Sequence, residues 1–153
     1  MINLQLYKYY NMPTIQLSRV HGEFGFEATD ENGHTIKMDS SPESGGLNYG
    51  VRPMQSLLMA LGGCSAIDVI SILKKQRQDI VDYKMTISGE REKGKEPSLW
   101  QTIHVKFQLY GDIDKDKAAR AVDLSINKYC SVAATLMKAG AKITTSVVVH
   151  PAI

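Results

Sequence analysis

Residues 53–76 read PMQSLLMALGGCSAIDVISILKKQ, and this stretch decides the fold. Pro53 suits the first turn of a helix, where a backbone N–H would have no helical partner. The residues that follow are apolar on almost every side of a helix axis, and charge rises only at Lys74 and Lys75, where cations favour a helix C-terminus. The pattern predicts a long central helix, 53–76, that is buried along most of its length and surfaces at its basic end.

The segments on either side of this helix predict a mixed α+β fold. Those before it predict short strands at 14–20, 23–29 and 35–38, followed by a glycine-rich loop at 40–50. Those after it predict strands at 83–90 and 99–110, helices from Asp112 or Asp114 to 126 and at 130–139, and a strand at 143–149. Few of these connections are the helical crossovers that parallel strands require, so the pairing should be largely antiparallel.

The composition is that of one globular domain. The 153 residues are 43% hydrophobic and 22% charged, which predicts a single domain over 1–153, with 1–12 as an N-terminal extension. A formal charge of +2 is far from the basic surface of a nucleic-acid binder. No apolar run approaches the roughly 20 residues that span a bilayer, and the first ten residues lack a secretory pattern. We therefore expect a cytoplasmic protein that binds neither nucleic acid nor a membrane.

The central helix also predicts self-association. Its apolar residues surround the helix axis, whereas a sheet of about six strands from one chain has only one face to cover it. Part of the helix should therefore need a second copy of the chain, and a twofold dimer is the commonest closed arrangement.

The chain has two cysteines, which lie in contrasting positions. Cys64 follows Gly62 and Gly63 inside the predicted helix, where two adjacent glycines lose about 1 kcal/mol each relative to alanine, so another requirement must favour them, such as close approach of a backbone or a substrate. Cys130 falls at a predicted break between helices, which would place its sulfur near the N-terminus of the next helix, where the dipole favours a thiolate. Sequence spacing alone does not tell whether the two thiols meet.

Other interpretations of the cysteines remain open at this point. A free cysteine is often a small buried hydrophobic residue, so both thiols could be inert. Metal ligation is disfavoured because the chain has no C-x-x-C or H-x-x-x-H motif and its histidines are scattered over predicted loops and strands, at His21, His34, His104 and His150. No histidine stands in a recognisable relation to either cysteine, as a Cys-His hydrolase would need. We expect no metal and no cofactor.

The sequence resembles the OsmC-like family of osmotically inducible and organic hydroperoxide resistance proteins. The resemblance rests on the run RPMQSLLMALGGCS at 52–65, on a second cysteine before the residues SVA at 131–133, and on the order of elements, and it covers about 14–149. It implies an intertwined homodimer in which antiparallel sheets wrap around paired long helices, with a thiol site at the subunit interface.

The resemblance also implies a reaction. Cys64 would be the peroxidatic nucleophile that attacks the O–O bond of an organic hydroperoxide, releasing an alcohol and leaving a sulfenic acid. Cys130 would resolve this sulfenic acid as a disulfide, which an unidentified dithiol would then reduce. The protein would be a thiol peroxidase of the oxidative stress response, an oxidoreductase that needs no metal.

The rest of the family site matches less well. The family uses an arginine that stabilises the thiolate and a glutamate, directly after the proline, that fixes the arginine. This sequence has Met54 at the glutamate position, followed by the neutral Gln55, and a methionine cannot orient an arginine. Arg19 and Arg52 are both candidates for the arginine, although either could be an ordinary surface residue.

The residues themselves indicate Asp68 as one candidate to replace the missing glutamate. It follows Cys64 by four positions, so both lie on one helix face. A carboxylate there disfavours a thiolate unless a cation lies between them, so Asp68 could anchor an arginine. Alternatively, it faces solvent or caps a neighbouring element.

A second function remains open beside the peroxidase. The protein could be a redox-sensing module, or one that binds a small apolar ligand, which keeps the fold and the cysteines without turning over peroxide. An apolar Met54 would then widen an apolar pocket at the interface while removing a charge from the site.

Overall fold

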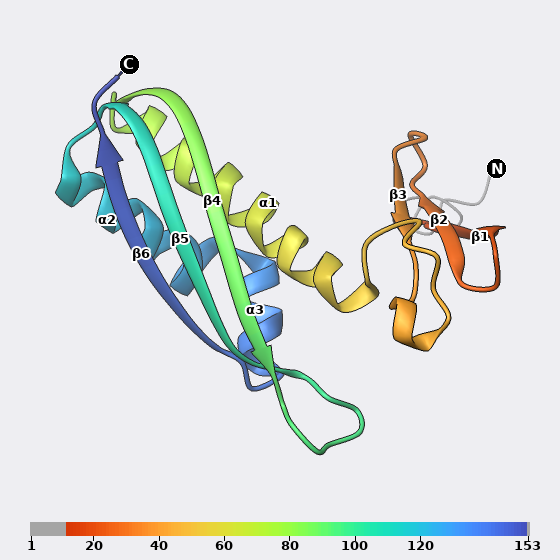
Figure 1. Ribbon diagram of the computed structural model, residues 1–153. Helices are drawn as coiled ribbons and strands as arrows, with labels where there is room; N and C mark the ends of the chain where they lie inside the picture. Colours follow the sequence, from red (N-terminus) through yellow and green to blue (C-terminus); the bar gives the residue numbers. More distant parts are fainter. Residues whose placement is uncertain (1–11, 153) are drawn as a thin grey trace, which may run out of the picture. The chain divides into compact units, whose positions relative to one another are not determined.

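The computed structural model describes residues 12–152, so most of the predicted N-terminal extension, 1–12, lies outside the described residues. The chain divides between Ser56 and Leu57 into two compact units, a first unit before this point and a second unit after it (Figure 1). The predicted class is confirmed: the fold is α+β, and the strands among the described residues are six that form two three-stranded sheets rather than one sheet.

The first unit is built on an antiparallel sheet with the order β1-β2-β3. Its strands match the three predicted ones to within two residues and are β1 (Gln16–His21), β2 (Gly25–Thr29) and β3 (Thr35–Met38). The turn between β2 and β3 is held by Asp30, whose carboxylate accepts the backbone N–H groups of Asn32 and His34. Asp and Asn side chains favour such turns because they can bond to the backbone just ahead of them.

The loop that leads from β3 to the long helix is organised around a buried aspartate. Asp39 is only 3% exposed, and its carboxylate accepts the backbone N–H groups of Ser40, Leu47 and Tyr49 at 2.7, 2.8 and 2.9 Å. The N–H groups of Tyr49, Leu47 and Ser40 hold the pKa of Asp39 below its ordinary value, against the opposing effect of burial. The loop, including its short 3-10 turn η2 (Pro42–Ser44), therefore has one anchor.

The long helix α1 (Pro53–Lys75) begins at the predicted proline and ends one residue before the predicted end. The prediction that it is buried along most of its length is wrong for the single chain. Its fully buried residues form one line with a spacing of four, at Leu61, Ser65, Val69 and Leu73. The opposite side is open, and Met59 and Ile67 are 55% and 69% exposed. A three-stranded sheet presents one face to the helices, so it covers only one side of α1.

Helix α1 is also more apolar than the sequence analysis expected. By length and composition it could cross a bilayer, since its best 18-residue window has a mean hydropathy of 1.9, so the expectation that no apolar run approaches a membrane-spanning length is wrong. Gly62, Gly63 and Ser65 interrupt the apolar run without lowering this average much. A central helix that is apolar on all sides passes the same test as a membrane span.

The second unit contains the other sheet, with the order β4-β5-β6. Strands β4 (Asp79–Arg91) and β5 (Trp100–Asp112) pair antiparallel, as the sequence predicts, whereas β5 and β6 (Lys142–His150) run parallel. The parallel pair forms because the connection between these two strands is helical, as parallel strands require. Alternate residues of β5 make the core: Ile103, Val105, Phe107 and Leu109 are at most 1% exposed.

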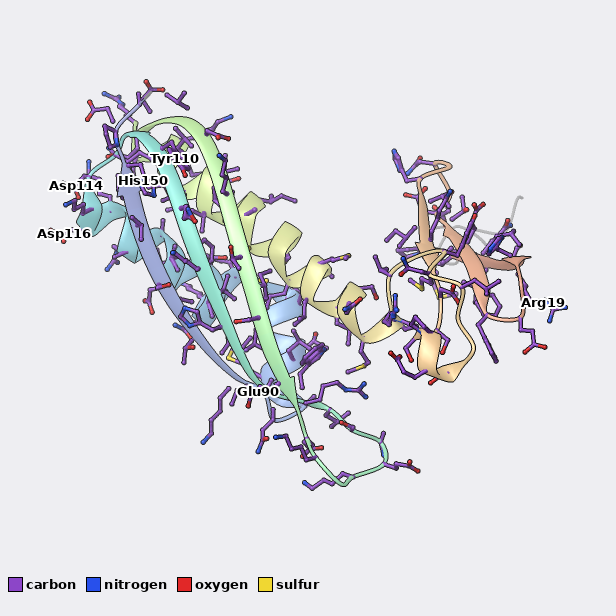
Figure 2. The ribbon with its side chains drawn as sticks, viewed as in Figure 1. Arg19, Glu90, Tyr110, Asp114, Asp116 and His150 are labelled. Carbon is purple, nitrogen blue, oxygen red and sulfur yellow. The ribbon has the colours of Figure 1, made fainter. Side chains whose placement is uncertain are left out.

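The helices of the second unit all lie on one face of this sheet (Figure 1). Helix α2 (Lys115–Leu124) is capped by Asp114, whose side chain accepts the Lys117 N–H at 2.9 Å, while Asp112 stays in β5. A π-helical turn, η3 (Ser125–Tyr129), leads into α3 (Ser131–Lys138). At one end of the sheet Tyr110 of β5 stacks on His150 of β6, with ring centroids 4.6 Å apart (Figure 2).

Candidate functional site

The second unit brings the two cysteines together. Cys64 lies on α1 and Cys130 at the start of α3, and their sulfur atoms are within 4.8 Å of each other. Both are free thiols, with Cys64 half-buried and Cys130 only 2% exposed. A disulfide needs an S–S distance of about 2.05 Å, so the pair needs a further approach to close one.

Cys130 occupies the position before the first turn of α3. Its backbone is extended, and its sulfur accepts the Ala133 N–H at 3.3 Å, which places the thiol at the helix N-terminus as the sequence predicts. Burial nevertheless raises the pKa of Cys130 to about 11, and the neighbouring Cys64 thiol adds to the rise while the Ala133 N–H opposes it. Desolvation therefore outweighs the helix terminus, and Cys130 is protonated at neutral pH.

The π-helical turn η3 holds Cys130 in place. The Cys130 N–H donates to the Ser125 carbonyl at 2.8 Å, and the buried Ser125 hydroxyl lies 3.3 Å from the Ser65 carbonyl oxygen. The same hydroxyl lies 3.2 Å from Asp68 Oδ2. Such turns are rare and recur at functional sites, because they shift side chains that a regular helix would place elsewhere. Ser125 thus ties η3 to α1 beside the thiols.

Asp68 is the third member of the cluster. One of its carboxylate oxygens lies within 4.8 Å of both sulfur atoms, and the side chain is half-buried rather than directed into solvent. Its hydrogen bond runs to the Ser125 hydroxyl of the neighbouring turn. Within the described part of the second unit no ion pair joins a lysine or arginine to Asp68. The structure therefore brings together three of the predicted site residues, Cys64, Cys130 and Asp68.

The two candidate arginines belong to the first unit. Arg19 extends from the exposed strand β1 (Figure 2). Arg52 donates through Nη1 to Asn48 Oδ1 at 3.3 Å and to the Gly50 carbonyl at 3.4 Å, and its charge contributes to the lowered pKa of Asp39. Arg52 thus helps to hold the loop before α1. The contacts of Arg19 and Arg52 within the first unit do not identify either one as the partner of the thiols.

Met54 and Gln55 lie in the first turn of α1. Gln55 is exposed, and its Oε1 accepts the Arg52 N–H at 3.2 Å, so it caps the helix end. Met54 is half-buried. Of the two glycines before Cys64, Gly62 packs closely against β4, since a Cβ there would lie 2.9 Å from the flexible end of the Ile87 side chain. A Cβ at Gly63 would meet nothing within 4 Å, so this position lies open on the exposed side of the helix.

A cavity of about 490 Å³ adjoins the cluster. Asp68 forms part of its wall, and the other lining residues come from the C-terminal half of α1 and from α2 and η3: Ser71, Ile72, Lys75, Gln76, Leu124 and Tyr129. The buried Gln76 Oε1 has no hydrogen-bond partner among the described residues. Neither Ser125 nor this cavity was predicted from the sequence, since a single serine inside a helical segment has no distinctive pattern.

Comparison with known proteins identifies the class. The sequence pattern of the family described as OsmC-like protein matches residues 44–146, so the chain belongs to the OsmC-like family. The protein YhfA of Escherichia coli (strain K12) is 49% identical over 115 residues, which cover 74% of this chain and 82% of YhfA. Family members are soluble proteins, which favours α1 as the central helix of a soluble fold.

Solved structures agree with this assignment. A hypothetical protein from Aquifex aeolicus VF5 superposes with a TM-score of 0.74 and 32% identity, covering 92% of this chain and 98% of that one. An organic hydroperoxide resistance protein OsmC from Legionella pneumophila superposes with a TM-score of 0.69 over 90% of this chain and 97% of that one. At 14% identity, the second likeness establishes the shared fold.

Proposed function

We propose that this protein is a cysteine-based thiol peroxidase that reduces organic hydroperoxides in the cytoplasm, as part of the defence against oxidative stress. The observation that carries the proposal is the pair of free thiols whose sulfur atoms lie within 4.8 Å of each other in an OsmC-like fold. The solved Legionella protein, described as an organic hydroperoxide resistance protein, supports this choice of substrate.

The roles of the two cysteines follow from their burial. Cys64 is half-buried whereas Cys130 is only 2% exposed, so Cys64 is the thiol that a peroxide can reach first. Its thiolate attacks the O–O bond; the alkoxide leaves and takes up a proton, and Cys64 becomes a sulfenic acid. Cys130 stays protonated until then. Its sulfur attacks the sulfenic sulfur, hydroxide leaves with the Cys130 proton as water, and an external dithiol reduces the disulfide.

Asp68 takes the place of the missing glutamate in this proposal. Its carboxylate is fixed by Ser125 and lies beside both sulfur atoms, so a guanidinium bound there would lie close to the Cys64 thiolate. Arg19 and Arg52 are the candidates for that guanidinium, from the same chain or from a second copy.

The active form is a homodimer in which two OsmC-like domains wrap around paired α1 helices. The exposed side of α1 carries a strip of small or apolar residues at helical spacing, Ala60, Gly63, Ile67 and Ser71. Such a strip lets a second helix approach closely and be buried, next to Cys64. Sedimentation of the reduced protein should show a dimer at micromolar concentration, and a stable monomer would contradict this part of the proposal.

Stopped-flow mixing tests the reaction itself. Reduced protein should lose two thiols for each cumene hydroperoxide consumed, and more slowly with hydrogen peroxide. The Cys130→Ser variant should accumulate a sulfenic acid on Cys64 that dimedone traps, and mass spectrometry reports the adduct. No loss of thiol with either peroxide would refute the peroxidase.

Two observations favour the alternative function, a small-molecule-binding or redox-sensing module. The cavity beside Asp68 has a volume of about 490 Å³, and Met54 stands where the family peroxidases carry a charge. Native mass spectrometry of protein purified from its host separates the two functions. A retained stoichiometric small molecule favours binding, and an empty site with reversible thiol oxidation favours catalysis.

A further inference from the structure

The cluster of Cys64, Cys130 and Asp68 has the spacing of a metal site. The two sulfur atoms and a carboxylate oxygen all lie within 4.8 Å of one another. In a tetrahedral zinc site with Zn–S bonds of about 2.3 Å, neighbouring sulfur ligands are about 3.8 Å apart. The two sulfur atoms therefore need to close by about 1 Å or less, which rotation of the side chains can supply.

The three donors come from two elements that the fold already holds together. Cys64 and Asp68 are four residues apart on one face of α1, and Cys130 faces them from the N-terminus of α3. Two of the three ligands also accept a hydrogen bond that orients them. The Ser125 hydroxyl donates to Asp68 Oδ2, and the Ala133 N–H donates to Cys130 Sγ. Contacts of this kind fix the direction of metal ligands.

The donor set selects the metal. Two soft thiolates favour Zn²⁺ and related thiophilic ions, whereas Mg²⁺ and Ca²⁺ prefer sites made of oxygen alone. Two thiolates and a carboxylate carry three negative charges in a partly buried place, and a divalent cation balances two of them. Three protein ligands leave a fourth position open. Asp68 also lines the cavity of about 490 Å³ that adjoins the cluster.

We propose that the reduced protein binds one Zn²⁺ per chain through Cys64 Sγ, Cys130 Sγ and an Asp68 carboxylate oxygen, with the fourth position open to water. Binding displaces the two thiol protons. Zinc and peroxide then compete for the same sulfur atoms. When a hydroperoxide and two protons convert the two thiolates into a disulfide, an alcohol and water, the site loses two ligands and releases the metal. The binding itself does not rest on the proposed peroxidase function.

Cobalt(II) is a direct probe of this site, because tetrahedral sulfur ligation gives it visible absorption and a sulfur-to-metal charge-transfer band. Anaerobic titration of reduced wild-type protein should give both signals, saturating at one ion per chain, and zinc should remove them. Asp68→Asn should weaken binding by at least about tenfold. The matched control is Asp116→Asn, on the exposed first turn of α2, which should bind as the wild type does (Figure 2).

Thiol removal is tested in two ways. Cys64→Ser and Cys130→Ser should each abolish the charge-transfer band. Wild-type protein blocked with methyl methanethiosulfonate should also lose it and recover it after treatment with a phosphine reductant, which covers the case in which a serine variant does not fold. Absence of the band in reduced wild type, its persistence after blocking, or equal affinity of Asp68→Asn and wild type would each overturn the proposal. None of these measurements uses peroxide, so their failure is distinct from failure of the peroxidase assay.

Discussion

Asp39 and Asp68 are both withdrawn from solvent, yet their surroundings differ. The Asp39 carboxylate accepts three backbone N–H groups, from Ser40, Leu47 and Tyr49. Asp68 accepts from the Ser125 hydroxyl, the one donor among the described residues, and lies beside two sulfur atoms. A carboxylate can accept about four hydrogen bonds. Asp39 is therefore largely satisfied and fixes a loop, whereas Asp68 keeps unused lone pairs for a cation, whether a guanidinium or a metal ion.

The largest expected effect is on the rate of the peroxide reaction and comes from the cysteines beside Asp68. Cys64→Ser should slow the reaction with cumene hydroperoxide by at least about a thousandfold, because a serine hydroxyl stays protonated at neutral pH and is a weak nucleophile. Cys130→Ser should keep the first step and lose disulfide formation. Stopped-flow fluorescence with thiol quantification checks both variants. If Cys64→Ser reacts as the wild type does, the nucleophile has been assigned to the wrong residue.

The second expected effect is on the Asp39 side and concerns stability alone. Asp39→Ala removes the acceptor for three backbone N–H groups and should speed hydrogen exchange of the Ser40, Leu47 and Tyr49 amides by about tenfold or more. Asp30→Ala, at the exposed turn between β2 and β3, is the control and should leave these amides unchanged. Peroxide reactivity lost in proportion to this loosening would mean that the two carboxylates are not independent.

Acid pH should reproduce this loosening without a mutation. The folded-state pKa of Asp39 lies below the ordinary value of 3.8, so its contribution to stability is present above pH 3.8 and is lost as pH falls through the lowered value. Exchange of the same amides should accelerate over that range in the wild type. Asp39→Asn should show a flat profile there, and an unchanged acid profile in this variant would assign the effect to another carboxyl group.

The local signals in the sequence predicted most of the secondary structure, and long-range packing accounts for the failures. Pro53 and the two lysines fixed α1 to within one residue, and Asp114 was one of two proposed caps. The burial of α1 was overestimated because periodicity reports which residues are apolar and not how much sheet is available to cover them. The parallel pairing of β5 and β6 was not predicted for the same reason.

The site was predictable in its residues and not in its geometry. Cys64 and Asp68 share a helix face by spacing alone, whereas Cys130 comes from a distant segment and lies directly after the π-helical turn η3. The π-helical turn has no simple sequence pattern, so Ser125 was not predicted as a site residue. The arginine could not be chosen from the sequence, since Arg19 and Arg52 both precede α1 and no short-range pattern ties either one to the thiols.

The role of Asp68 in the peroxide reaction is tested by removing its charge. If Asp68 anchors an arginine at the thiols, Asp68→Asn should slow the peroxide reaction about tenfold, because a guanidinium that is no longer held beside Cys64 stabilises its thiolate less. The fold should be unaffected, so thermal unfolding should resemble that of Asp116→Asn. A faster reaction in Asp68→Asn would show the reverse, a carboxylate that faces the thiols with no cation between them.

The smallest expected effect belongs to Ser125, which acts through Asp68. Ser125→Ala removes the hydroxyl that lies 3.2 Å from Asp68 Oδ2, and the loss of one hydrogen bond should slow the peroxide reaction by about threefold. Ser131→Ala, at an exposed position in the first turn of α3, is the matched control. A simple loss of packing would also slow the reaction, so the double variant Asp68→Asn/Ser125→Ala distinguishes the two explanations. If Ser125 is a positioning residue, the double variant should react as slowly as Asp68→Asn alone. If the two rate reductions multiply instead, the serine acts on the packing of the core and not on the carboxylate.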